Sequence, residues 1–269
     1  MPTANHGLDA PQQLGRFVLR WFIGWWNTIH LGAVILALGL SPSSYGAANR
    51  QVFARHIVGS TLPVLAGFTV VWALIGVVVI RIVVVTAISY GLSQYAVEMV
   101  VRVLVMELIP MATALFVALR FSIPESEEIS NLRAYGVLGA GEGRGRDSGG
   151  LQREVLPRVA ASVFSVCLLA ALACVVTLAL AYLSVYGFNP WGFEAYTRIV
   201  GRIFGPAVAL IFAMKVLFLA LAVSLIPAAS ALFGIVRAHA RTEAELRGLV
   251  RMFVVILLIE LVSLVSNYA

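Results

Sequence analysis

Charged residues are scarce in this chain. Of its 269 residues, 12% are Asp, Glu, Lys or Arg and 61% are hydrophobic, whereas soluble domains carry about 25% charged residues. The mean hydropathy is +0.95, and the apolar residues form long blocks rather than short periodic stripes. Because too few polar residues remain to cover a water-facing surface, the composition excludes an ordinary soluble domain. It predicts an all-α integral membrane protein.

Lysine is almost absent, because Lys215 is the only lysine among 19 basic residues. A Walker A phosphate loop requires a lysine between Gly and Ser or Thr, but Lys215 lies between Met214 and Val216. The chain therefore cannot be a P-loop ATPase, and any ATP and Mg²⁺ would be bound by a separate partner chain. The few histidines and cysteines are not spaced as metal ligands, and we find no nucleophile–base pair typical of an enzyme.

Five apolar stretches are each long enough to cross a bilayer, which takes about 17–25 residues. They are residues 57–88, 94–119, 159–183, 204–236 and 249–265. Together they predict a five-span domain over residues 57–269.

The N-terminal part is expected to differ from these spans. Residues 1–13 are polar and are predicted to be disordered. Residues 14–56 contain Trp21, Trp25 and Trp26 beside arginines, a combination typical of the membrane interface. We therefore predict an interfacial elbow helix and its connection to the first span. A sixth span and an uncleaved signal are the competing interpretations.

The arginines predict the orientation. The loop 120–158 holds six of them, whereas residues 89–93 and the tail after residue 265 hold none. Basic residues accumulate on the cytoplasmic side, so we expect this loop to be cytoplasmic and the C-terminus to lie outside. Within the loop, residues 122–135 predict a short surface helix. The glycine-rich residues 136–150 predict a flexible linker rather than a nucleotide site.

Ionisable groups inside the spans are the most informative residues. They are Arg81, Glu98, Arg102, Glu107, Lys215 and Glu260. Glu98 and Arg102 are four residues apart near an outer end, which predicts an ion pair on one helix face. Glu107, Lys215 and Glu260 lie at similar mid-membrane depth on three spans, where a charge costs at least about 2.5–3.5 kcal/mol. We expect them to form one buried group, acting either as a structural staple or as a polar lining or coupling element.

Residues 104–120, LVMELIPMATALFVALR, resemble the MlaE/YrbE family of lipid ABC-transporter permeases. The resemblance extends over about residues 50–269. It rests on acidic, proline and basic positions of the second span and on charged positions of the last two spans. The matching positions are Tyr90, Glu107, Leu108, Pro110, Arg120, Glu128, Ile129, Arg133, Lys215, Phe218 and Glu260.

The resemblance implies a permease subunit in a bacterial inner membrane. It would act as a homo- or heterodimer, with separate ATPase subunits and a periplasmic MCE-domain protein, and no nucleic-acid partner is expected. Phospholipid or a similar hydrophobic molecule would be moved through a cavity lined by Tyr90, Leu108 and Glu107. The ATPase would dock on the cytoplasmic loop, at Glu128, Ile129, Leu132 and Arg133.

One departure from the family pattern concerns this docking loop. Family members continue after the basic position of Arg133 with a helix that enters the ATPase, but here the glycine-rich linker follows. Either the segment 122–135 docks the ATPase differently, or the chain is the weaker half of a heterodimer. A non-transporting scaffold that anchors the partners is the main alternative function, and an ion-coupled carrier using the buried carboxylates is a third.

Overall fold

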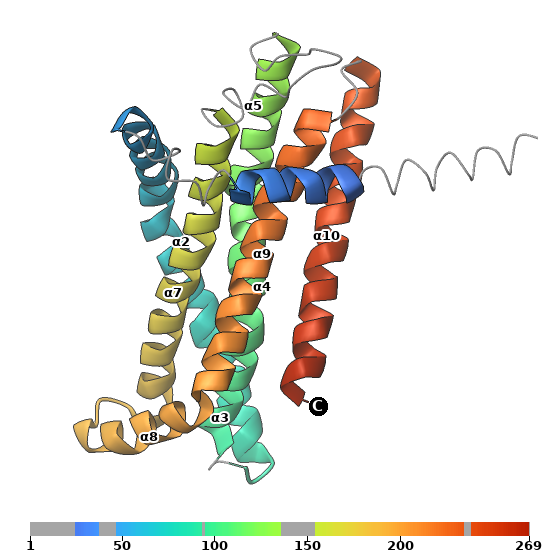
Figure 1. Cartoon of the computed structure of the whole chain (residues 1–269). Coiled ribbons are helices and arrows are strands. Elements are labelled where there is room, and N and C mark those ends of the chain that lie inside the picture. The colour runs from blue at the N-terminus through green and yellow to red at the C-terminus, as the bar shows by residue number, and fades with distance from the viewer. Residues whose placement is uncertain (1–24, 38–46, 93–94, 136–153, 234–237, 269) are drawn as a thin grey trace, which may run out of the picture.

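The computed structural model describes residues 25–37, 47–92, 95–135, 154–233 and 238–268, and all the regular structure in these ranges is helical. Five helices are long and apolar enough to cross a membrane, which confirms the predicted all-α bundle of five spans (Figure 1). The elements are α2 (Ala47–Ser89), α3 (Ala96–Val100), the π-helical η3 (Val101–Leu108), α4 (Ile109–Val117), the π-helical η4 (Ala118–Ser122), α5 (Ile123–Ala134), α7 (Leu156–Tyr186), the 3₁₀ turn η6 (Pro190–Gly192), α8 (Phe193–Ile203), α9 (Pro206–Phe233) and α10 (Ala238–Tyr268).

The second span is one continuous helix from Ala96 to Ala134, 39 residues long. At 1.5 Å per residue it measures about 58 Å, well beyond the roughly 30 Å of hydrocarbon. The helix expected over 122–135 is therefore an extension of this span and not a separate surface element. Each π-helical segment precedes a proline, Pro110 or Pro124, at the start of the next α-helical segment. The wider π turns shift the hydrogen-bond register, so that these prolines are accommodated without breaking the helix.

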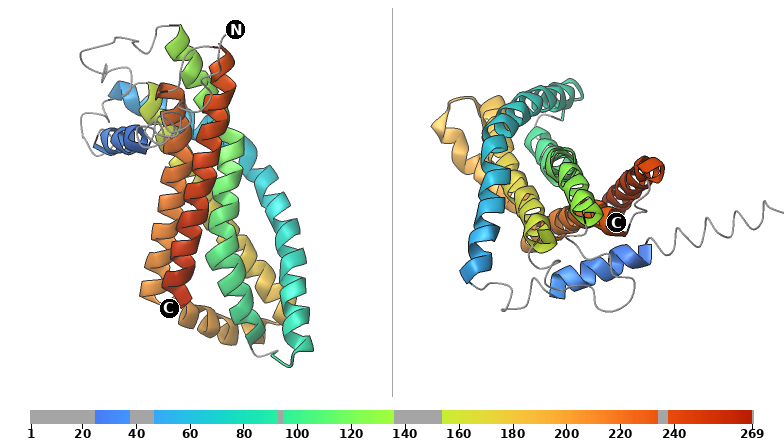
Figure 2. Two further views of the ribbon diagram at one scale, coloured as in Figure 1. Left: turned by 90° about the vertical axis from the view of Figure 1, so that its right-hand side faces the viewer. Right: turned by 90° about the horizontal axis from the view of Figure 1, so that it is seen from above.

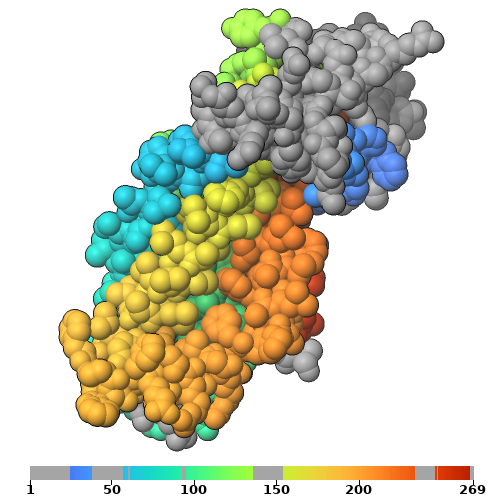
Figure 3. Space-filling model, turned by 60° about the vertical axis from the view of Figure 1, so that its left-hand side comes forward, coloured from blue at the N-terminus to red at the C-terminus, as the bar shows by residue number. Residues whose placement is uncertain are grey.

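Helix α7 lies at the centre of the packing, with α2 on one side and α9 on another, while α10 packs chiefly on α9. Figure 3 shows α7 and α9 side by side along one face, with α8 across their end. Two buried hydrogen bonds join α2 to α7. Trp72 Nε1 donates to Thr177 Oγ1 at 2.9 Å. The hydroxyl oxygens of Thr61 and Ser165 lie 2.7 Å apart and form the second bond. Polar contacts of this kind help to hold apolar helices together where water is absent.

Helix α8 closes the end of the bundle opposite α5 (Figure 1). The sequence had indicated only a connection there, although Tyr196, Ile199, Val200 and Ile203 recur at helical spacing and pack on the core. Tyr196 Oη donates to the carbonyl of Leu178 at 2.8 Å. Burial, together with the neighbouring tyrosine, raises the pKa of Tyr196 to about 12.

Residues 25–37 form a helix that lies across the bundle near the α5 end (Figures 1 and 2). Leu31 and Ile35 are buried there in an apolar cluster with Ile129 and Leu156. This crosswise placement is the one expected of the elbow helix and not of a sixth span. Residues 1–13 and 136–150 lie outside the described residues, so the expected disorder and flexible linker stay predictions.

Candidate functional site

Glu107, Lys215 and Glu260, hereafter the charge cluster, meet in the middle of the bundle. Lys215 on α9 has a side chain that is only 2% exposed. Its ammonium donates to Glu107 Oε2 and, at 2.9 Å, to Glu260 Oε1. The structure thus brings together three residues that are 45 or more positions apart in sequence, from η3, α9 and α10.

The backbone carbonyl of Met106, four residues before Pro110, is the third partner of the lysine. Pro110 has no N–H, so it cannot bond the carbonyl of Met106, which lies one α-helical turn earlier. Lys215 Nζ donates to that carbonyl at 3.1 Å. All three hydrogens of the ammonium therefore have an acceptor. The backbone of the second span thus supplies one of the three acceptors of the only lysine in the sequence.

The two carboxylates are less completely satisfied than the lysine. The side chains of Glu107 and Glu260 are 17% and 14% exposed. Their second oxygens, Glu107 Oε1 and Glu260 Oε2, are enclosed and meet no hydrogen-bond partner among the described residues. Removing one member of a buried ion pair typically costs about 3–5 kcal/mol, because the remaining charge is left uncompensated. Here the loss of Lys215 would leave two such charges.

The residues expected to line a lipid cavity lie at different heights. Tyr90 is 78% exposed in the turn between α2 and α3. Leu108 is half-buried and contacts two of the core clusters. Glu107 lies eleven residues after Ala96, the first residue of α3, which corresponds to about 16 Å along the helix. Leu108 and Glu107 are thus neighbours near the middle of the bundle, whereas Tyr90 lies at its end.

The expected ATPase-docking residues occupy α5, and one of them is not on the surface. Ile129 is 1% exposed and packs beneath the helix of residues 25–37, so it stabilises the bundle and is not available to a partner. Glu128 is exposed but its carboxylate binds the buried Arg158 guanidinium of α7 at 3.0 Å. Leu132 and Arg133 are half-buried. The sequence reasoning counted Arg158 only as a topology signal and missed this contact.

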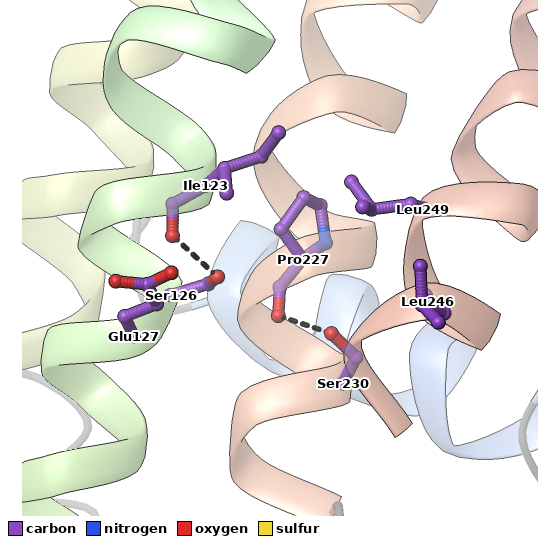
Figure 4. A pocket seen from close by; sticks show the side chains of 8 residues that line it. Ile123, Ser126, Glu127, Pro227, Ser230, Leu246 and Leu249 are labelled. Atoms are coloured by element: carbon purple, nitrogen blue, oxygen red, sulfur yellow. Dashed lines mark hydrogen bonds between the residues drawn. The ribbon is translucent and has the colours of Figure 1, made fainter. Parts of the chain in front are cut away.

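A small pocket of about 150 Å³ lies beside α5, between α9 and α10 (Figure 4). The hydroxyls of Ser126 and Ser230 are both directed to carbonyls of their own helices, those of Ile123 and Pro227. Drug-sized ligands occupy pockets of about 300–1,000 Å³. This pocket is therefore too small to hold a phospholipid.

The comparison with known families identifies the chain. The model of the permease family MlaE matches residues 53–265, which include most of α2, all later spans and the whole charge cluster. The chain belongs to the MlaE permease family. Membership indicates a transport subunit, and the five spans make this MlaE permease a multi-pass membrane protein. No curated protein matches the chain significantly.

Proposed function

We propose that this chain is the permease subunit of an ABC transporter that moves phospholipid, or a similar hydrophobic molecule, between a bacterial inner membrane and a periplasmic MCE-protein assembly. Separate ATPase subunits would supply the energy, because the only lysine of the chain is not in a phosphate loop. The observation that carries the proposal is the charge cluster, which joins three spans within the region matched by the MlaE permease family.

The charge cluster is suited to couple movements of helices. Helix α10 packs chiefly on α9, and the carboxylate of Glu260 is tied through Lys215 to Glu107 on η3. A displacement of α10 must therefore either carry the second span with it or break the cluster. An ATP-driven transporter has to alternate between two arrangements that its ligands bind differently. An ionic contact that is closed in one arrangement and broken in the other would distinguish the two.

The apolar surface of the spans supports a hydrophobic substrate. Large side chains are exposed along α2 and α10, among them Leu74, Leu257 and Leu261, each more than 60% exposed. Such surfaces fit lipid tails, and the partly exposed Glu107 next to Leu108 adds a polar group at the edge of the core. A site for an amphiphile needs this combination of an apolar wall and a few polar groups. Tyr90 would meet lipid only at the end of the bundle.

The ATPase would dock at the α5 end of the bundle. Glu128, Leu132 and Arg133 remain the candidates for contact, since Ile129 is buried in the bundle. The ion pair of Glu128 with Arg158 fixes this extension of the second span against α7. A force applied to α5 would then reach both the second span and α7.

The proposal is tested by purifying the chain in mild detergent with the products of its neighbouring reading frames and reconstituting the complex. We expect ATPase and MCE subunits in stoichiometric amounts, together with ATP-dependent transfer of labelled phospholipid. Stable assembly without lipid transfer would instead favour the scaffold. Transfer that persists without ATP and follows a proton gradient would favour the ion-coupled carrier.

A further inference from the structure

Two aromatic side chains are almost fully exposed at the α8 end of the bundle. Phe188 is 94% exposed and Trp191 is 90% exposed, and both lie in the connection between α7 and α8. Phe193, the first residue of α8, is 58% exposed. An aromatic side chain buries about 150–250 Å² when it is covered. A group of uncovered apolar side chains of this size marks a surface that contacts a partner other than water.

The backbone that carries these side chains is fixed. A side chain at Gly192 would meet Tyr186, because its Cβ would lie 2.7 Å from a ring carbon of that tyrosine. The side chain of Asn189 accepts a hydrogen bond from the backbone N–H of Trp191 at 3.2 Å, and Tyr182 Oη donates to the carbonyl of Asn189. Trp191 is therefore held outward on an ordered backbone, so that little conformational freedom is lost when it is covered.

The charge cluster gives the depth of this connection in the membrane. Lys215 lies nine residues after Pro206, the first residue of α9, which is about 14 Å along the helix. Glu107 lies about 16 Å from Ala96, measured toward the same end of the bundle. Half the thickness of the hydrocarbon is about 15 Å. With the charge cluster at the bilayer centre, the α8 end of the bundle thus lies at the boundary between hydrocarbon and headgroups.

The connection points to the side of the bundle and not along its axis. Figures 1 and 3 show α8 beginning beyond the end of α7 and running back across the bundle. Its exposed aromatic residues continue the apolar surface of the adjoining spans, where Leu183 of α7 is 39% exposed and Leu210 of α9 is 65% exposed. A side chain that projects sideways at this depth meets the surrounding bilayer.

Helix α8 has the polarity of a helix at a membrane surface. Tyr196 and Ile203 are buried against the bundle. On the other face, Glu194 and Arg198 form an ion pair with side chains that are 84% and 71% exposed, and Arg202 is exposed as well. Aromatic residues beside a charged helix face are typical of the interface between hydrocarbon and water.

We propose that Phe188 and Trp191 lie in the headgroup region of the bilayer and anchor the α8 end of the bundle there. The partner is the surface of the bilayer itself and not the transported molecule, so the inference rests on the five spans and not on the proposed function. The anchor holds the adjoining ends of α7 and α9 at a constant depth. Because α9 carries Lys215, the anchor also fixes the depth of the charge cluster.

The position of Trp191 is tested by fluorescence quenching of the full chain with its partners. The complex is placed in vesicles of phosphatidylethanolamine and phosphatidylglycerol that contain a spin-labelled phosphatidylcholine. The emission of Trp191 is the difference between the wild type and Trp191→Phe. We expect a blue-shifted emission that loses most of its intensity when the label is near the headgroup. It should lose little with the label at the end of the acyl chain, or with acrylamide in the water.

Two controls accompany this measurement. Trp72, measured in the same way through Trp72→Phe, is 3% exposed and should lose little intensity with any of the quenchers. The anchoring itself is followed by amide hydrogen exchange in α8 in the same vesicles. The double variant Phe188→Ser/Trp191→Ser should speed this exchange several-fold, whereas Arg198→Gln, on the exposed face of α8, should leave it unchanged.

Three results would overturn the inference. The first is an emission of Trp191 that is typical of water and is quenched chiefly by acrylamide. The second is protection from acrylamide and from both lipid labels that appears only when the partner subunits are present, because a protein would then cover this surface. The third is unchanged exchange of α8 in the double serine variant. None of these measurements uses lipid transfer, so a failure of the inference is distinguishable from a failure of the proposed function.

Discussion

Replacing Lys215 by methionine tests the charge cluster most simply. Methionine nearly matches the length of the lysine stem, so packing changes little, but the ammonium that joins Glu107 to Glu260 is lost. Two carboxylates would then face each other in a part of the bundle where each is at most 17% exposed. We expect a loss of about 3–5 kcal/mol in the free energy of unfolding. For chains of 150–250 residues this corresponds to a fall in Tm on the order of 10 °C.

Neutralising the carboxylates should reverse most of this loss. Buried ionic groups can often be replaced by uncharged residues of similar volume at little or no net cost. The triple variant Glu107→Gln/Lys215→Met/Glu260→Gln should therefore melt much closer to the wild type than Lys215→Met alone. Arg198→Met is the control, because its ion pair with Glu194 is solvent-exposed and such pairs contribute at most about 1 kcal/mol.

The assay is thermal unfolding in detergent micelles, followed by intrinsic fluorescence. Lys215→Met melting within a degree or two of the wild type would show that the charge cluster does not hold these helices together. A triple variant as unstable as Lys215→Met would refute the electrostatic explanation and point to packing around the lysine stem.

Three further predictions concern polar contacts elsewhere in the bundle. Arg158→Gln should release α5 from α7. The cost in the free energy of unfolding should be about 1 kcal/mol, because its partner Glu128 is 63% exposed. Amide hydrogen exchange in α5 should become faster. Thr177→Val should cost about 1 kcal/mol, because Trp72 loses its acceptor, and a double-mutant cycle with Trp72→Phe measures this. Tyr196→Phe should remove the tyrosine that ionises near pH 12. A titration of tyrosinate absorbance would then lack the corresponding step. Burial raises the pKa of Tyr196 from 10 in the unfolded chain to about 12 in the folded one. The neutral phenol therefore contributes stability that is complete below pH 10 and is lost as the pH rises to about 12.

Each of these predictions has an outcome that contradicts it. Unchanged exchange in α5 of the Arg158 variant would mean that apolar contacts alone fix this extension. Additive effects of the substitutions at Thr177 and Trp72 would remove the case for a direct bond between them. A tyrosine spectrum of the Tyr196 variant that differs from the wild type near pH 10 would show that this phenol is hydrated.

The charge cluster could be predicted from sequence because a bilayer makes isolated charges expensive. A charged side chain at mid-membrane requires a partner of opposite charge. Because Glu107, Lys215 and Glu260 lie at similar depth on three spans, they were predicted to pair with one another. The same reasoning gave the five spans and the ion pair of Glu98 with Arg102. In each case the signal is one-dimensional, either depth along a span or spacing along one helix.

The contacts that escaped prediction depend on which face of a helix is turned inward. Ile129 was expected to meet the ATPase, but the helix of residues 25–37 covers it. The role of Arg158 was invisible because positive-inside counting treats every arginine alike. The carbonyl of Met106 becomes a partner for Lys215 only because α9 packs against the second span at this height. Tertiary geometry of this kind is not encoded in hydropathy.

The most direct test of the central claim is ATP-dependent phospholipid transfer by the neutral triple variant, assembled with its ATPase and MCE partners and compared with wild type. We expect this variant to keep the fold, but it lacks the ionic link between the second span, α9 and α10. We predict that it assembles and hydrolyses ATP but transfers little lipid. Transfer at the wild-type rate would contradict a coupling role and would reduce the charge cluster to a structural staple.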